Sequence, residues 1–274
     1  MRSKKMTKKT YLLMLLPLLA ACKKEIDMDY RQVAPMYVVE AFINQDKTSV
    51  RISTTVDMSE QTGSRNAVDN AVVTLLSEGR ELDRLTHTRN GYYASSWRGN
   101  AGTTYTMAVD IDGNRYTSTS TMQKKPQMNS FRFVWKDVLT ERVLFAELKL
   151  QDIRETTNYY FMHIYRNNIG YRWAVMRDDM NPNGELEQLF NCTTKREMDK
   201  GTEDDLLREG DKIKVDIRAI DRRAYDYLYS MQVMDNTGSN PIANFTGGCL
   251  GYFSAYYGIT YECIFHLDEV EEAD

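Results

Sequence analysis

The sequence TTYTMAVDIDGNRYTSTSTM, residues 103–122, carries the clearest structural signal in this chain. Residues with high strand propensity alternate in polarity on both sides of Asp112-Gly113, which is the pattern of two β-strands. An Asp-Gly pair tolerates the positive φ angles of a tight primed turn. The segment therefore predicts a β-hairpin, with strands over Thr103–Ile111 and Arg115–Met122.

The residues before this hairpin show the same character. Asn90-Gly91 is a second tight-turn dipeptide between two strand patterns. Five further strands are predicted, over Tyr37–Ile43, Ser49–Val56, Ala71–Leu76, Leu82–Thr88 and Tyr92–Ser96. Seven short strands within residues 36–122 favour an immunoglobulin-like β-sandwich.

A second β-rich domain is predicted over residues 127–267, after the linker Gln123-Lys124-Lys125-Pro126. Asp221 is placed to cap a helix near residues 221–234. The acidic residues 268–274 predict a solvated tail. The predicted strands are Phe131–Lys136, Val143–Gln151, Tyr159–Arg166, Tyr171–Met176, Lys212–Ile220, Cys249–Ala255 and Thr260–Leu267. The predicted fold is therefore mainly β, an N-terminal sandwich followed by a β-rich domain carrying one helix.

The beginning of the chain has the pattern of a bacterial lipoprotein signal peptide. A basic segment with Arg2 and four lysines precedes the apolar run Tyr11–Leu19, which is too short to span a bilayer, and Leu19-Ala20-Ala21-Cys22 ends it. We expect residues 1–21 to be removed, Cys22 to carry the acyl chains, and residues 22–35 to form a lipidated tether. An ordinary secretory signal with an incidental Cys22 is the alternative.

The residues after Cys22 bear on location. Lys23-Lys24-Glu25-Ile26-Asp27 mixes lysine with acid and resembles the surface-export signal of Bacteroidota lipoproteins. We expect the protein in the cell outer membrane, with the outward face favoured over the periplasmic face.

The charge of the chain excludes some partners. Removing residues 1–21 takes away five basic residues, so 35 basic against 39 acidic residues become 30 against 39, a net charge near −9. Nucleic acid and anionic lipid headgroups are therefore poor partners.

No motif in the sequence predicts catalysis, a cofactor or a metal. The three histidines, His87, His163 and His266, fall in strand patterns, and no nucleophile elbow, zinc-binding helix, phosphate loop or dinucleotide fingerprint is present. The segment Asp179–Glu187 spaces oxygen-bearing residues like a calcium loop, but Phe190 occupies its twelfth position, so we interpret it as a polar turn. The expected protein is not an enzyme.

Tyrosine is the residue type in excess that could serve binding. An aromatic ring can stack on a flat ligand at little cost in conformational entropy. The candidate ligand-contact residues lie beside two predicted turns and are Tyr171, Trp173, Tyr252, Tyr256 and Tyr257. The alternative is that these rings fill sandwich cores, because aromatic residues have high strand propensity.

Three cysteines remain besides Cys22. An oxidising compartment permits one bridge and leaves one thiol over. Cys192 with Cys249 is the candidate disulfide, since it would close a long loop and restrain the unfolded chain by about 4 kcal/mol. Cys249 with Cys263 across a hairpin, or buried free thiols, are the alternatives.

The order of several loose motifs resembles the Bacteroidota lipoprotein family called domain of unknown function 4249. The motifs are VVEAFI at 38–43, GYY at 91–93, GTTYTMAV at 102–109, NYY at 158–160 and NP at 240–241 followed by NFTGGCLGYF at 244–253. The resemblance implies an accessory or substrate-capture partner of a TonB-dependent nutrient transporter, with an unknown nutrient or protein ligand. A structural or adhesive envelope lipoprotein that binds other proteins is the alternative.

Overall fold

The computed structural model of the chain describes residues 34–56, 66–153, 156–178, 184–201, 205–237 and 241–273. The predicted signal peptide, Cys22 and the tether up to residue 33 lie outside the described residues. So do residues 179–183 of the segment Asp179–Glu187.

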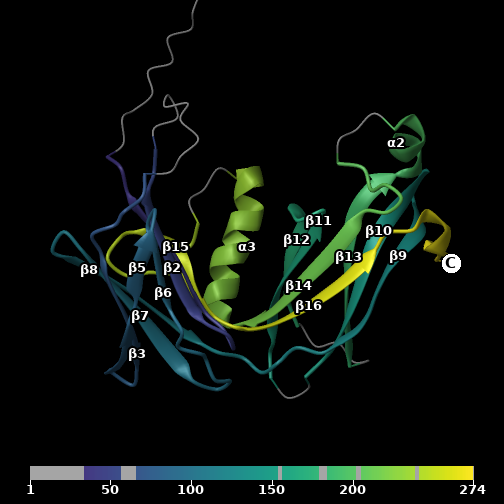
Figure 1. Ribbon diagram of the computed structural model, residues 1–274. Helices are drawn as coiled ribbons and strands as arrows, with labels where there is room; N and C mark the ends of the chain where they lie inside the picture. Colours follow the sequence, from purple (N-terminus) through teal and green to yellow (C-terminus); the bar gives the residue numbers. More distant parts are fainter. Residues whose placement is uncertain are drawn as a thin grey trace, which may run out of the picture. The chain divides into compact units, whose positions relative to one another are not determined.

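The first half of the described chain is a sandwich of two sheets (Figure 1). One sheet contains β1 (Tyr37–Ile43), β2 (Thr48–Thr54), β6 (Tyr92–Ser95) and β5 (Thr86–Arg89), in that order. The other contains β4 (Arg80–Arg84), β3 (Val72–Ser77), β7 (Thr104–Ile111) and β8 (Asn114–Thr121). In the nomenclature of immunoglobulin-like domains, β1-β2-β6-β5 is the strand order A-B-E-D and β3-β7-β8 is the order C-F-G, and β4 is one extra strand beside C.

Local chemistry explains this sandwich. Asp112 and Gly113 both have positive φ, so the predicted β7–β8 hairpin closes with a primed turn. Val39 and Ile52 from one sheet meet Val109 from the other in a shared core from which water is excluded. Tyr105 is buried near the start of β7, and its hydroxyl accepts a hydrogen bond from the Asn100 N–H at 2.9 Å, the arrangement of a tyrosine corner.

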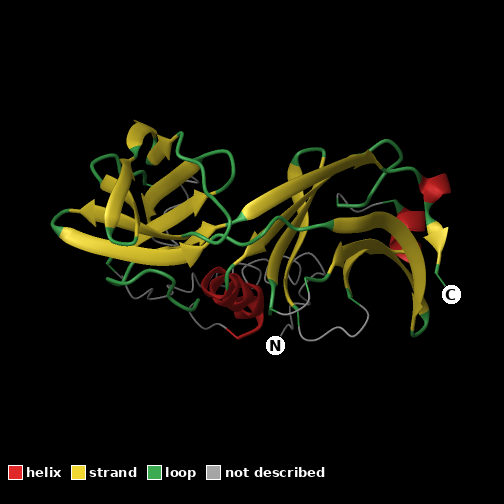
Figure 2. Ribbon diagram, turned by 90° about the horizontal axis from the view of Figure 1, so that it is seen from below, coloured by secondary structure: helices red, strands yellow, loops and turns green. Residues whose placement is uncertain are grey.

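The second half is also a sandwich. One sheet contains β13 (Glu185–Thr194), β10 (Glu141–Gln151), β9 (Met128–Val138) and β17 (Glu271–Glu272). The other contains β12 (Ile169–Arg177), β11 (Tyr159–Arg166), β14 (Lys212–Ile220) and β16 (Tyr257–Ile264). The short helix α2 (Lys195–Lys200) follows β13. The orders β9-β10-β13 and β12-β11-β14-β16 repeat those of β1-β2-β6 and β4-β3-β7-β8, so the second domain has the strand order of the first. Figure 2 shows that strands make up most of both halves.

The connection between β14 and β16 carries α3 (Arg222–Thr237), the one long helix in the described part of the chain, as the sequence predicts. The Asp221 carboxylate caps it by accepting the Ala224 N–H at 2.9 Å. Ala224 and Leu228 bury one side of α3 against Phe161 of β11 and against Ile220.

The same connection also carries β15 (Leu250–Ala255), which pairs in parallel with β1 of the first sandwich. The predicted boundary between domains 36–122 and 127–267 is therefore crossed, because residues 250–255 complete the first sheet. Phe253 and Ala255 enter the first core, and residues 35–274 group as one unit. Strand propensity predicts that these residues form a strand, but it does not identify the strand they pair with.

The predicted acidic tail is in part an ordered strand. A 3-10 turn, η2 (Leu267–Glu269), leads into β17, which pairs in parallel with β9. Glu271 forms an ion pair with Arg132, and Glu272 forms one with Arg142. Charge complementarity to these arginines explains why the acidic residues add to the sheet edge.

The predicted Cys192–Cys249 disulfide is absent. Cys192, Cys249 and Cys263 are free thiols, and Cys192 lies in the second core whereas Cys249 lies in the first. Burial raises the pKa of both Cys192 and Cys249 to about 11. Each thiol serves as a small apolar core residue.

One buried carboxylate lies on the outer face of β10. Glu147 contacts Arg132 Nε at 2.6 Å, Lys136 Nζ at 3.3 Å and Lys149 Nζ at 3.7 Å. Burial alone would raise the pKa of Glu147, but hydrogen bonds from Arg132, Glu187 and Lys136 bring it from 4.5 down to about 2.

The close approach of β15 to β1 makes Gly251 a sensitive position. Its φ is +97°, and an added Cβ would lie 2.0 Å from the Val39 carbonyl oxygen. We expect Gly251→Ala to lower the free energy of unfolding by more than about 3 kcal/mol in urea titration. Gly113→Ala is the control: its φ is +79° with nothing near the added Cβ, so it should cost about 1 kcal/mol. Equal losses in the two variants would contradict the close contact.

The free thiols predict a labelling pattern. With iodoacetamide and no reductant, Cys192 and Cys249 should stay unmodified in the native protein because burial and a raised pKa suppress the thiolate. Both should be modified in denaturant. Mass spectrometry of peptides measures this, with the half-buried Cys263 as the faster-reacting internal control. If Cys192 and Cys249 stayed unmodified in denaturant, the two residues would be joined in a disulfide and the free-thiol assignment would be wrong.

Glu147 predicts an acid dependence of stability. Because its pKa in the folded protein lies below its ordinary value, its stabilisation is complete above about pH 4.5 and is lost as the pH falls towards 2. Glu147→Gln should lower the free energy of unfolding at pH 7 by about 2 kcal/mol, and the difference from wild type should shrink in acid. The exposed Glu81→Gln should change it by less than about 0.5 kcal/mol. A difference that is constant from pH 7 to 2.5 would refute this assignment.

Candidate functional site

The outer face of the sheet β12-β11-β14-β16 presents a row of rings that we call the aromatic face: Phe161, His163, Tyr165 and Trp173. Strand alternation sends Met162 and Ile164 into the second core, so Phe161, His163 and Tyr165 share the opposite face. Trp173 of β12 lies directly opposite His163 in the register. The face is therefore set by backbone pairing.

The rings contact one another in sequence. The centroids of Trp173 and Phe161 lie 6.0 Å apart, those of Phe161 and His163 5.9 Å, and those of His163 and Tyr165 4.1 Å in a stacked geometry. Trp173 is 39% exposed, so the row is open to solvent at β12.

Charged residues of β14 lie beside these rings. Lys214 Nζ lies 4.2 Å from the Tyr165 centroid, and Arg218 Cζ lies 5.2 Å from that of Phe161. Asp216, between them on the strand, accepts the Thr260 hydroxyl at 3.0 Å and lies 3.8 Å from Arg218. Burial and the charge of Arg218 lower the pKa of His163, so its imidazole is neutral at neutral pH.

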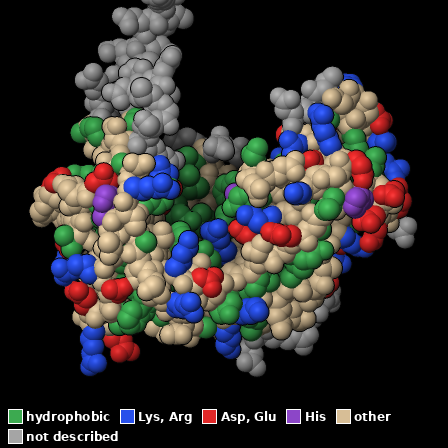
Figure 3. Space-filling model, in the orientation of Figure 1, with side chains coloured by type: hydrophobic (Ala, Val, Ile, Leu, Met, Phe, Trp, Pro, Cys, Tyr) green, Lys and Arg blue, Asp and Glu red, His purple; other side chains and the backbone are tan. Residues whose placement is uncertain are grey.

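Next to this face, Arg218 lines two larger cavities that we call together the Arg218 cleft. The larger, about 290 Å³, is lined by Glu40, Ala41, Phe42, Ser49, Arg51, Tyr92, Arg218 and Tyr252. The smaller, about 190 Å³, is lined by Asn44, Gln45, Asp46, Asp216, Arg218, Tyr256, Gly258, Ile259 and Thr260. Figure 3 shows Lys and Arg side chains around the region between the two sandwiches, with hydrophobic side chains in the hollow beside them.

Direct hydrogen bonds hold the two walls of the cleft together. The Gln45 amide donates to the Gly258 carbonyl at 2.9 Å and accepts the Gly258 N–H at 3.2 Å. Asn44 donates to the Tyr256 hydroxyl at 3.2 Å. The β1–β2 turn of the first sandwich is thus fixed to the start of β16 in the second.

The structure places three of the five predicted aromatic residues at this site. Tyr252 and Tyr256 line the cleft, and Trp173 lies on the aromatic face. Tyr171 is elsewhere: its hydroxyl donates to the Cys192 carbonyl at 3.3 Å and burial raises its pKa. Tyr257 packs against the first core. These two rings are structural.

Sequence reasoning missed the cations of the site. Alternation in KVDIR, residues 214–218, predicts that Lys214, Asp216 and Arg218 share one face, and the same period groups Phe161, His163 and Tyr165. The pairing of β11 with β14 joins these two groups, and that pairing was not predicted from the sequence.

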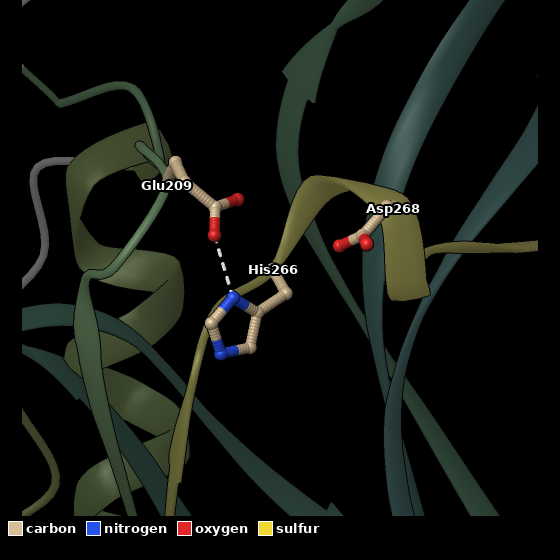
Figure 4. Close-up of side chains that lie close together, drawn as sticks. All are labelled: Glu209, His266 and Asp268. Atoms are coloured by element: carbon tan, nitrogen blue, oxygen red, sulfur yellow. Dashed lines mark hydrogen bonds and ion pairs between the residues drawn. The ribbon is translucent and has the colours of Figure 1, made fainter.

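Among the described residues, one cluster could hold a cation: Glu209, His266 and Asp268, whose ligand atoms lie within 4.8 Å of one another. Figure 4 shows His266 Nδ1 joined to Glu209 Oε1, at 2.5 Å, with Asp268 turned apart. The second Glu209 oxygen accepts the Leu267 N–H at 2.9 Å. The hydrogen bond to Glu209 raises the pKa of His266 and favours a protonated ring. The contacts of Glu209 with His266 and Leu267 therefore stabilise the start of η2.

A broader cavity of about 710 Å³ lies beside α2, and basic residues are prominent in its lining. Lys195 pairs with Asp199 at 2.9 Å, and Arg196 pairs with Glu141 at 2.9 Å. These charges are compensated within the chain, which makes this cavity a weaker binding candidate than the Arg218 cleft.

Described helices contain no stretch long and apolar enough to cross a membrane. No curated protein sequence matches the chain. Among solved structures, a two fibronectin type-III domain segment from chicken tenascin is similar at 12% identity, covering 85% of this chain and 100% of that chain, with a TM-score of 0.23. That score is too low to carry an argument, and the fold assignment rests on the strand order.

A family described as Domain of unknown function (DUF4249) matches residues 23–257. The match includes nearly all strands of both sandwiches, the helix α3 and the crossing strand β15. On this match over most of its length, the chain belongs to the family of domain of unknown function 4249.

Proposed function

We propose that this protein is a lipid-anchored, non-enzymatic capture module of the outer membrane, acting with a TonB-dependent nutrient transporter. The aromatic face carries the proposal: rings lie in register with two cations on a rigid sheet, beside a cleft. Such a surface suits recognition, because pre-positioned rings lose little conformational entropy on binding.

The arrangement of the polar groups supports binding rather than catalysis. His163 is stacked on Tyr165, and Asp216 is engaged by Thr260 and Arg218. Each of these titratable groups has a partner that fixes its orientation. Their role in this proposal is to position rings and charge for a ligand.

The anchor part of the proposal comes from the sequence. Basic residues, a short apolar run and Leu19-Ala20-Ala21-Cys22 are the features that lipoprotein processing requires. Two or three acyl chains on Cys22 would give effectively permanent attachment. The resemblance to Bacteroidota lipoproteins favours the outward face of the outer membrane and a transporter as the partner.

The anchor and the partner can be tested in one strain set. Wild-type protein should incorporate labelled palmitate, remain with the outer membrane and recover a TonB-dependent transporter from solubilised membranes. Cys22→Ser should lose the label and the membrane attachment, and Cys263→Ser is the matched control that should keep both.

Two outcomes would count against the proposal. Absence of palmitate from wild-type protein would remove the anchor. Recovery of no transporter, together with altered cell adhesion but unchanged growth on defined nutrients in a deletion strain, would identify an adhesive lipoprotein instead.

A further inference from the structure

The larger cavity of the Arg218 cleft has a guanidinium group from each sandwich. Arg51 comes from β2 of the first sandwich, and Arg218 comes from β14 of the second. Glu40 is the one carboxylate in its lining. With two cationic side chains and one anionic side chain in its lining, this cavity favours a negatively charged ligand.

Arg51 has an unused hydrogen-bond donor. Its Nε is buried and has no hydrogen-bond partner among the residues that the structure describes. Its Nη1 lies 4.0 Å from the Glu40 carboxylate, and its Cζ lies 5.3 Å from the Tyr92 centroid. The Nε and Nη edge of an arginine matches the two oxygens of a carboxylate, and a buried donor left unpaired is unfavourable.

Arg218 is held in place by rings. Its Cζ lies 4.9 Å from the Tyr256 centroid and 5.2 Å from that of Phe161, and its ion pair with Asp216 is long, at 3.8 Å. Its charge is therefore only partly compensated. A ligand that binds here would meet a guanidinium that its ring contacts have already ordered.

A second unsatisfied group, Ser254, lines a separate small void that shares Phe42, Tyr252 and Arg218 with the larger cavity. Ser254 is 3% exposed, and its hydroxyl has no hydrogen-bond partner among the described residues. The void measures about 10 Å³. That volume is about the size of one water molecule.

The remaining walls are flat rings. Tyr252 stacks on Tyr227 of α3, with centroids 5.0 Å apart and planes at 16°, so its orientation is fixed. Tyr92 is 41% exposed on the other side. A planar or ring-shaped ligand would find an apolar surface beside the two arginines, in a volume near the lower limit for small-molecule sites.

We infer that this cavity binds a small monocarboxylate that carries a ring, with its carboxylate at Arg51 and Arg218 and its ring beside Tyr252 and Tyr92. The inference rests on the proposed capture function and names the chemistry of its ligand. An aromatic acid and a sugar acid share this chemistry.

Isothermal titration of the full chain with benzoate and glucuronate tests the inference, with benzyl alcohol and glucose as the uncharged counterparts. We expect one of the two acids to bind and its uncharged counterpart to bind at least about tenfold more weakly. Arg51→Gln and Arg218→Gln should each weaken the acid by about tenfold or more. Arg84→Gln, on the exposed strand β4, is the matched control and should leave binding unchanged.

A measurement on unaltered protein keeps the test valid if a Gln variant fails to fold. The Nε–Hε nuclear magnetic resonance signal of Arg51 should move on addition of the acid that binds and stay in place with its uncharged counterpart. The acid that moves the Arg51 signal shows whether the ligand is an aromatic acid or a sugar acid.

Three results would overturn the inference: no binding of either acid below about 10 mM, equal binding by Arg51→Gln and wild type, or an unmoved Arg51 signal at saturation. Transporter recovery is measured without added ligand. Failure to bind a carboxylate would therefore leave the proposed capture function standing. Failure to recover a transporter would leave the carboxylate site standing.

Discussion

The parallel pairing of β15 with β1 joins the two sandwiches of this chain. Six consecutive residue pairs, from Val38 with Leu250 to Ile43 with Ala255, place the connection after β14 in the sheet of the first sandwich. β16 begins at Tyr257, directly after this pairing ends, and returns the chain to the second sandwich. A hinge between the halves would have to break backbone hydrogen bonds or unfold the start of β16.

Buried polar groups make this crossing specific. The Asn244 side-chain oxygen accepts the Phe253 N–H at 2.7 Å and the Ser118 hydroxyl at 2.7 Å, so one amide orients both β15 and β8. Its side-chain nitrogen donates to the Arg223 carbonyl in α3 at 3.2 Å. Asp221 adds a second link by accepting the Thr121 N–H at 2.9 Å while it caps α3, and burial raises its pKa. Because a buried polar group without its partner is costly, these contacts favour one arrangement of strand and helix over shifted alternatives.

The sequence predicts the local elements well and their long-range partners poorly. The Asp112-Gly113 turn, the alternation through Val109 and the cap at Asp221 depend on residues close in the chain, and these predictions are confirmed. The partner of β15 depends on a free sheet edge about two hundred residues away, to which no local pattern points. The Cys192–Cys249 pairing failed for the same reason, because each cysteine belongs to a different core. For the candidate site, tyrosine content located Tyr252 and Tyr256, whereas Arg51 and Arg218 became neighbours of the cleft only through the crossing.

The position of the cleft follows from this topology. Arg51 and Tyr92 belong to the first sandwich, Arg218 belongs to the second, and Tyr252 lies on the crossing strand itself. Neither sandwich alone contains the complete lining, so a ligand that used both arginines would favour the joined arrangement. Because the pairing of β15 with β1 already fixes the walls of the cleft, a ligand would not have to bring the two sandwiches together. Most of the entropic cost of ordering such a shared site is therefore absent from binding. The same continuity means that a ligand held there also contacts the strand that links the two halves.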